Sequence, residues 1–177
     1  RIDRNTSGLV AAGKSLLGLQ ELSRLFKERT LHKYYLCYVA GTIKEPTKIK
    51  GYLWKNEKNN QVEIYSKERE DAKPIATEYR PIAWGEHTTL LEVKLITGRT
   101  HQIRAHLSSI GHPIVGDTKY GKKEVNDKYR KECHITSQLL HAYRIEFPKM
   151  ETKLSYLSGK EFVAEVPKEF KIMEKYR

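Results

Sequence analysis

The sequence predicts an α+β domain built on a mixed, largely antiparallel β-sheet with a few flanking helices. Three observations lead to this prediction. The chain of 177 residues has the length of one domain, and 38% of its residues are hydrophobic, which is enough to form a core. Apolar residues recur at helical spacing in residues 15–28. Short β-like runs separated by polar turns fill most of residues 50–97.

The N-terminal part of the chain predicts a strand, a helix and a second strand. Residues 8–13 (GLVAAG) are a short apolar run bounded by glycines, which suits a buried strand. Residues 34–39 (YYLCYV) are rich in β-formers and are followed by Gly41, which also indicates a strand. The amphipathic helix between them is predicted from five apolar side chains at i, i+3 and i+4 spacing: Leu16, Leu19, Leu22, Leu25 and Phe26.

The middle of the chain predicts antiparallel strands and a helix. Polar turns such as residues 56–60 separate four β-like runs, at residues 51–54, 62–65, 75–83 and 89–96. Thr100 is a plausible N-cap for a helix over residues 101–110. Gly111 stands where a left-handed C-cap residue is expected.

The remaining residues predict a loop, two strands and a terminal helix. Residues 122–132 are densely charged and have no apolar period, so we expect a solvated loop there. Residues 138–147 and 154–166 have the composition of strands. Residues 168–176 predict a short helix at the end of the chain.

The composition is strongly basic and points to a polyanionic partner. The chain has 33 Lys and Arg against 22 Asp and Glu, a net charge of +11, and 11 of its aromatic residues are Tyr. Nucleic-acid binding and a merely solubilising basic surface explain this charge equally well. No apolar run is long enough for a membrane span, and Cys37 and Cys133 form no CxxC pair. We therefore expect a cytoplasmic protein that does not enter a membrane.

Two polar clusters are candidates for chemistry. Residues 98–106 (GRTHQIRAH) lie at a predicted strand-to-helix junction, where His101 and Arg104 share a helix face. A purely structural interpretation makes Arg104 an ion-paired helix residue. Asp3 lies between two arginines, and a nearby guanidinium favours the charged form of a carboxylate. Taken alone, Asp3 is better explained as a turn residue.

Metal and cofactor chemistry find no support in the motifs. The sequence has no HExxH, no Cys–His set at zinc spacing, no P-loop, no GxGxxG and no GxSxG. We therefore expect neither a metal nor a cofactor. His141 has apolar neighbours on a predicted strand and suits a core histidine.

Four segments, in this order, resemble the pseudouridine synthases of the RluA type. Residues 1–9 (RIDRNTSGL) look like the catalytic signature of that family without its leading His. Residues 33–41 resemble the second motif, with Cys37 in place of the usual Ala. Residues 98–121 resemble the third motif, and residues 140–142 with 164–167 resemble the closing strands. The resemblance covers nearly the whole chain.

The resemblance implies isomerisation of uridine to pseudouridine in structured RNA, either large-subunit ribosomal RNA or transfer RNA. It implies Asp3 as the nucleophile, Tyr35 as a residue that stacks on the base and assists proton transfer, and Arg104 as the partner of Asp3. The residues expected to contact RNA are Arg1, Arg4, Arg99 and His101, with Arg1 filling the place of the flipped base.

The resemblance also implies a domain organisation. Family members begin their catalytic domain several dozen residues before the Asp3 motif. We therefore expect residues 1–177 to be a pseudouridine synthase domain that lacks its upstream strands and any S4-type RNA-binding module. We expect a monomer. The alternative function is an RNA-binding module without catalysis or a ribosome-associated protein, neither of which needs Asp3, Tyr35 and Arg104 together.

Overall fold

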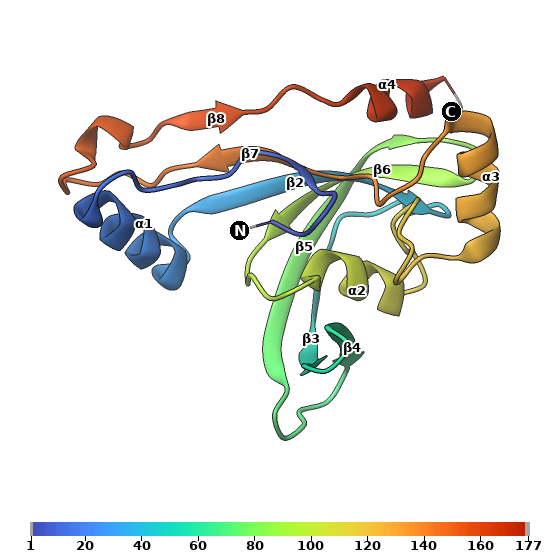
Figure 1. Ribbon diagram of the computed structural model, residues 1–177, viewed down its shortest axis with the longest axis horizontal. Helices are drawn as coiled ribbons and strands as arrows, with labels where there is room; N and C mark the ends of the chain where they lie inside the picture. The colour runs from blue at the N-terminus through green and yellow to red at the C-terminus, as the bar shows by residue number, and fades with distance from the viewer. Residues whose placement is uncertain (1, 176–177) are drawn as a thin grey trace.

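A computed structural model describes residues 2–175 and has one large mixed sheet at its centre (Figure 1). The sheet has eight strands in the order β1-β7-β2-β6-β5-β3-β4, and β8 pairs with β7. All pairs are antiparallel except β1 with β7. The predicted fold class is therefore confirmed. The strands are β1 (Ser7–Gly8), β2 (His32–Ala40), β3 (Thr47–Asn56), β4 (Gln61–Tyr65), β5 (Lys73–Trp84), β6 (Thr88–Leu95), β7 (Leu140–Glu146) and β8 (Glu161–Val163).

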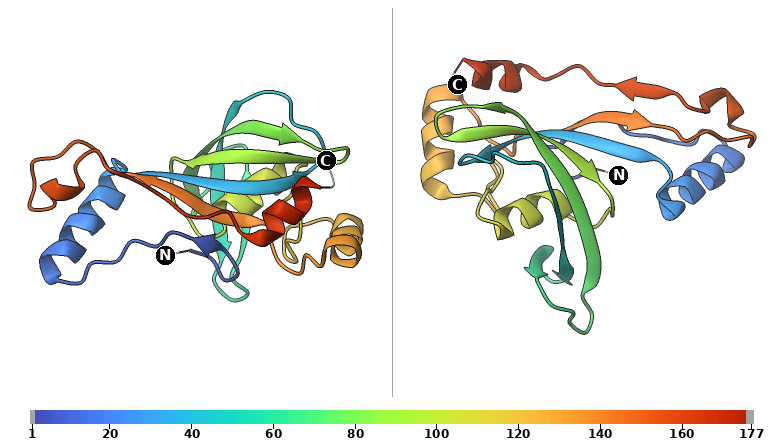
Figure 2. Two further views of the ribbon diagram at one scale, coloured as in Figure 1. Left: turned by 90° about the horizontal axis from the view of Figure 1, so that it is seen from above. Right: turned by 180° about the vertical axis from the view of Figure 1, so that it is seen from behind.

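Four α-helices surround the sheet, and Figure 2 shows that α2 and α4 lie on opposite sides of it. They are α1 (Leu16–Glu28), α2 (Gln102–Ser109), α3 (Lys123–Cys133) and α4 (Lys168–Glu174). The predicted helix α1 is confirmed, and the Ser15 side chain caps it by accepting a hydrogen bond from the Gly18 N–H at 3.1 Å. Within residues 2–175, no helix has both the length and the apolar character needed to cross a bilayer.

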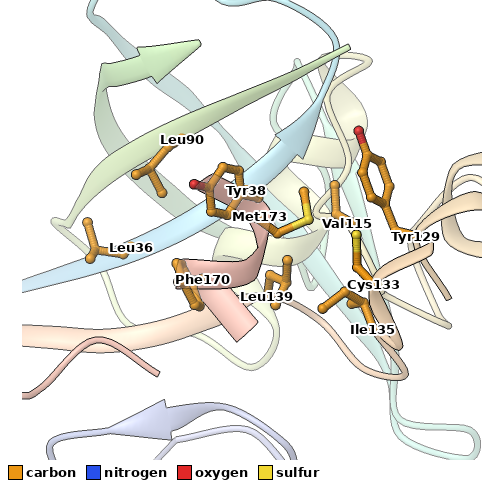
Figure 3. Packing of buried hydrophobic residues seen from close by; sticks show 10 residues of the cluster. All are labelled: Leu36, Tyr38, Leu90, Val115, Tyr129, Cys133, Ile135, Leu139, Phe170 and Met173. Carbon is orange, nitrogen blue, oxygen red and sulfur yellow. The ribbon is translucent and has the colours of Figure 1, made fainter. Parts of the chain in front are cut away.

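The central strand β2 has an apolar core on each face. Leu36 and Tyr38 point toward α3 and α4, where they pack with Phe170 and Met173 (Figure 3). The side chains of Cys37 and of the other odd-numbered residues around it on β2 point to the opposite face, because side chains alternate along a strand. They pack against Ile103 and Leu107 of α2, together with residues from β5 and β6. This second core fixes the position of α2 and therefore of the polar residues at its start.

The predicted buried strand at residues 8–13 is wrong. Only Ser7 and Gly8 pair with β7, and the last hydrogen bond runs from the Leu9 N–H to the Ala142 carbonyl. Val10 is 58% exposed, and the chain then crosses to α1 without further pairing. The apolar run is explained by Leu9 and Ala11, which pack against the cluster of α1 without joining the sheet.

The predicted charged loop at residues 122–132 is also wrong, because α3 occupies this segment. The helix docks through only three buried residues: Asn126, Tyr129 and Cys133. Asn126 is polar, but both ends of its side-chain amide are hydrogen-bonded. Its Oδ1 accepts from the Gly116 N–H, and its Nδ2 donates to the Asp117 carbonyl. The apolar face is limited to Val125, Tyr129 and Cys133 at i+4 spacing, and the charged residues between them obscure this period in the sequence.

Two helix ends and one strand differ from prediction. Thr100 is not the N-cap of α2: His101 holds that position in the left-handed region, with φ at 51° and no side-chain cap. In residues 154–166 only β8 is a strand, since residues 155–157 form a 3₁₀ turn. The terminal helix ends at Glu174, and Tyr176 lies outside the described residues.

Candidate active site

The segment that carries Asp3 is held against the end of β7 by backbone contacts. The Thr6 N–H donates to the Asp3 carbonyl at 3.1 Å, and the Gln138 amide donates to the Arg4 carbonyl at 2.6 Å. Gly8, with φ at 102°, lies so close to β7 that an added Cβ would come within 2.1 Å of the Ala142 carbonyl oxygen. These contacts position Asp3 although it lies near the start of the chain.

Arg104 joins two carboxylates from distant parts of the sequence. Its Nε donates to Asp117 Oδ2 at 2.7 Å and its Nη2 to Asp117 Oδ1 at 2.9 Å. The remaining Nη1 donates to Asp3 Oδ2 at 3.3 Å. The expected contact between Arg104 and Asp3 is therefore present. The stronger partner is Asp117, which sequence reasoning did not identify.

Asp117 is the rigid anchor of this cluster. It is fully buried and also accepts the backbone N–H groups of Lys119 and Tyr120 at 2.9 and 3.0 Å. Burial opposes its ionisation, but the hydrogen bonds and charge of Arg104, with the two backbone donors, lower the pKa of Asp117. The same pairing raises the pKa of Arg104 despite its burial. Both groups are therefore charged, and Asp117 orients the guanidinium.

Tyr35 lies on the face of β2 that carries the second core and packs against it. Burial, together with the negative charge of Asp3, raises the pKa of Tyr35 to about 12. The hydroxyl is therefore protonated at neutral pH, and Tyr35 offers a neutral aromatic ring with a proton to donate. Tyr35 also lines one cavity with Ile2, the residue before Asp3.

His101 enters the same cluster through Tyr120. The two side chains meet at 2.9 Å between His101 Nδ1 and the Tyr120 hydroxyl, which also accepts the Val62 N–H at 3.1 Å. Burial lowers the pKa of His101. The imidazole is therefore neutral at neutral pH.

The other residues expected to contact RNA are less constrained. Arg4 and Arg99 have exposed side chains, and their described contacts are made by backbone groups. Arg1 lies outside the described residues, so its expected position between bases stays a prediction. His141 is buried as expected, with Nδ1 at 2.8 Å from the Ser7 hydroxyl.

Asp117 and Tyr120 are the site residues that sequence reasoning missed. Both lie in the loop after α2, inside the third motif, and nothing in their local pattern shows which residue they contact. A Gly-Asp pair followed by Tyr-Gly could have drawn attention to them, because it places a carboxylate and a phenol in one tight polar turn. The pairing itself becomes visible only when α2 is packed on the sheet.

Known proteins resemble the chain over most of its length. Residues 1–109 match the family described as RNA pseudouridylate synthase. The chain belongs to this family. A similar curated relative is ribosomal large subunit pseudouridine synthase C of Vibrio cholerae, 38% identical over 87% of this chain and 48% of that protein. Synthase D of Nitrosomonas europaea is 32% identical over 82% of this chain and 42% of that protein.

These relatives confirm the resemblance to the RluA type, although the chain spans about half the length of the curated relatives it matches. Among solved structures, human RNA pseudouridylate synthase domain containing 1 superimposes with a TM-score of 0.70 and 27% identity. The superposition covers 86% of this chain and 61% of that one. The family thus shares both the motifs and the fold described above.

Proposed function

We propose that this protein is an RNA pseudouridine synthase that isomerises uridine in structured RNA without a cofactor or metal. The observation that carries the proposal is the Arg104 guanidinium, which binds the Asp3 carboxylate next to Ile2, a residue of the cavity that Tyr35 also lines, while Asp117 fixes the guanidinium itself. Family membership supports the same reaction. A binding module without catalysis needs no such arrangement of charges.

The isomerisation breaks the bond between C1′ and N1 of uridine and forms a bond between C1′ and C5. The proton on C5 leaves and a proton is taken up at N1, so the reaction is balanced without an oxidant or water. Asp3 serves as the nucleophile, in whichever order bond cleavage and adduct formation occur. Arg104 orients Asp3 and stabilises its charge in a site from which water is largely excluded.

Tyr35 stacks on the uracil and passes a proton. Its raised pKa means that it enters the reaction as a neutral phenol and not as a preformed phenolate base. Transfer of the C5 proton through this hydroxyl therefore requires a second acceptor, and the neighbouring Asp3 carboxylate is the available one. The two residues act together in this scheme.

The uridine reaches this site by leaving its base stack, because the reacting atoms are inaccessible within a folded RNA. Arg4, Arg99 and His101 contact the RNA around the flipped nucleotide, and Arg1 fills the gap it leaves. The net charge of +11 supplies the sequence-independent attraction to phosphate. The named functions of the relatives favour large-subunit ribosomal RNA over transfer RNA as substrate. A cytoplasmic, monomeric enzyme stays a prediction of the sequence.

The decisive experiment compares the natural full-length protein with its Asp3→Asn variant. Both are incubated with unmodified transcripts of large-subunit ribosomal RNA and of transfer RNAs, and pseudouridine is mapped chemically. We expect modification of one transcript class by the natural protein and a loss on the order of 10³-fold or more in Asp3→Asn. The matched control is Asp127→Asn, which changes an exposed carboxylate that pairs with Arg130 and not with Arg104.

Two results would overturn the proposal. Turnover by Asp3→Asn equal to that of Asp127→Asn would remove Asp3 from the chemistry. Stoichiometric RNA binding by the natural protein with no pseudouridine in either transcript would favour the binding-module alternative.

A further inference from the structure

Lys33 is a half-buried cation on the strand that carries Tyr35. It precedes Tyr35 by two positions on β2, so the two side chains project from the same face. Both line one cavity, together with Ile2 and Phe26. The Lys33 ammonium also lies next to the loop between β6 and α2: a Cβ added to Gly98 would be 3.3 Å from its Nζ.

No carboxylate neutralises this ammonium within residues 2–175. The ammonium lies over the Phe26 ring, and the ring centroid is 5.2 Å from Nζ. Burial, with a smaller contribution from the charge of Arg29, lowers the pKa of Lys33. The folded protein thus removes water from a cation and supplies no anion in exchange.

Arg144, which lines the same cavity, shows the usual alternative. Its guanidinium contacts Glu92, Glu146 and Glu161 and stacks on the Tyr34 ring with 3.8 Å to the centroid. A cation with this many partners has little capacity left for a ligand. Of the two, Lys33 is therefore the one with unused donors.

We propose that the Lys33 ammonium binds a backbone phosphate of the RNA beside the nucleotide that Tyr35 receives. This inference rests on the proposed function, because it takes RNA as the ligand. A phosphate oxygen matches a compact ammonium with three donors, and it supplies the missing counter-charge. Gly98 is exposed and has no side chain. An RNA strand can therefore approach Lys33 Nζ from this side.

The test uses two variants of the natural full-length protein that act in different ways. Lys33→Gln removes the charge, and Gly98→Val keeps the charge but blocks the approach to it. Gly98 does not have a positive φ, so the substitution does not strain the backbone. Lys94→Gln is the matched control, since Lys94 is a partly buried lysine on β6 whose Nζ is 5.8 Å from the Tyr34 ring. Lys33→Arg keeps the positive charge and tests whether that charge is enough for normal RNA binding.

Affinity is measured against salt concentration with an unmodified large-subunit ribosomal RNA transcript as the probe. We expect Lys33→Gln to reduce the magnitude of the log–log salt slope by roughly 0.7–0.9, the change for one lost phosphate contact. We also expect roughly tenfold weaker binding at ~0.1 M salt, a similar loss in Gly98→Val, and recovery in Lys33→Arg. Lys94→Gln should keep both the slope and the affinity of the natural protein.

Thermal unfolding separates binding from folding. Lys33→Gln should unfold at the temperature of the natural protein or above it, because the lost charge had no partner. The inference is overturned if Lys33→Gln and Lys94→Gln have the same salt slope, or if Gly98→Val binds as the natural protein does. Pseudouridine mapping with the natural protein is a separate readout. Its failure would contradict the proposed function, whereas unchanged slopes in an active enzyme would contradict only the role of Lys33.

Discussion

Arg104 and Arg144 both sit in clusters of carboxylates, but the two clusters differ in burial. The Arg104 side chain is 8% exposed and its partner Asp117 is 0% exposed. Arg144 is 19% exposed and its partners are Glu92, Glu146 and Glu161, exposed by 11%, 30% and 48%. Arg144 therefore has more carboxylates, whereas the main partner of Arg104 is completely shielded from water.

The difference teaches that burial and geometry, and not the number of partners, make an ion pair useful for chemistry. Asp117 holds two nitrogens of Arg104 in one plane, so the third nitrogen points in a defined direction toward Asp3. The contacts of Arg144 come from β6, β7 and β8 and are partly screened by solvent. The Arg144 cluster links β6, β7 and β8 but does not orient a side chain toward a substrate.

The largest effect is expected from Asp117→Asn, which leaves the buried Arg104 charge without its main counter-charge. We expect the free energy of unfolding to fall by about 3–5 kcal/mol, as measured by urea denaturation. The control Asp127→Asn removes an exposed ion-pair carboxylate that is 3.8 Å from Arg130 and should change the value by less than ~0.5 kcal/mol. A loss for Asp117→Asn as small as that of the control would mean that the Arg104 cluster is no more rigid than the Arg144 cluster.

Tyr35→Phe tests whether the Arg104 cluster, unlike the Arg144 cluster, serves the chemistry. The substitution removes the Tyr35 hydroxyl and leaves the ring. We expect the single-turnover rate on bound RNA to fall ~10²–10⁴-fold while affinity changes little. Tyr34→Phe is the matched control, since the Tyr34 hydroxyl bonds to Glu146 in the other cluster. Weakened binding with an unchanged rate of bound RNA would remove Tyr35 from proton transfer.

The helix that carries Arg104 also predicts a pH dependence of stability. Burial lowers the pKa of His106 from 6.5 to about 4, and its Nδ1 lies 3.0 Å from the Thr77 hydroxyl. As the pH falls below 6.5, the unfolded chain takes up this proton first, so stability is lost progressively down to pH 4. The loss amounts to about 3 kcal/mol.

Denaturation at several pH values checks this expectation. His106→Gln should flatten the profile between pH 6.5 and 4, even if it lowers stability throughout. His87→Gln changes an exposed imidazole and should retain the slope of the natural protein. Equal slopes in both variants would show that other groups cause the acid sensitivity.

The smallest effect is expected from Glu161→Gln in the Arg144 cluster. Glu161 is 48% exposed, and Arg144 keeps Glu92 and Glu146 after the change. The free energy of unfolding should fall by less than ~1 kcal/mol, and RNA modification should be unaffected. A change above ~3 kcal/mol in urea denaturation would show that the two arginine clusters are energetically alike.

Prediction from sequence succeeded where local patterns decide structure. The helical spacing of α1 and the β-rich runs and polar turns of β2 to β6 led to the observed elements within a few residues. It failed for α3, whose inward face has three residues, and for residues 8–13, where pairing stops after Gly8. In both cases the outcome depends on what the segment packs against, and periodicity does not contain that information.

For the candidate site, the sequence by itself indicated the family, and the resemblance to it predicted three catalytic residues, because these lie in motifs of fixed local spacing. Only the tertiary structure decided that Asp117, and not Asp3, is the principal partner of Arg104. It also decided that Lys33 has no carboxylate partner in the described chain while Arg144 has three. The physical reason is that charged residues far apart in the sequence pair in the fold. Arg104 on α2 binds Asp117, 13 residues away, and Asp3, 101 residues away. Burial at those meeting points, which no local pattern encodes, sets how strongly each pair holds.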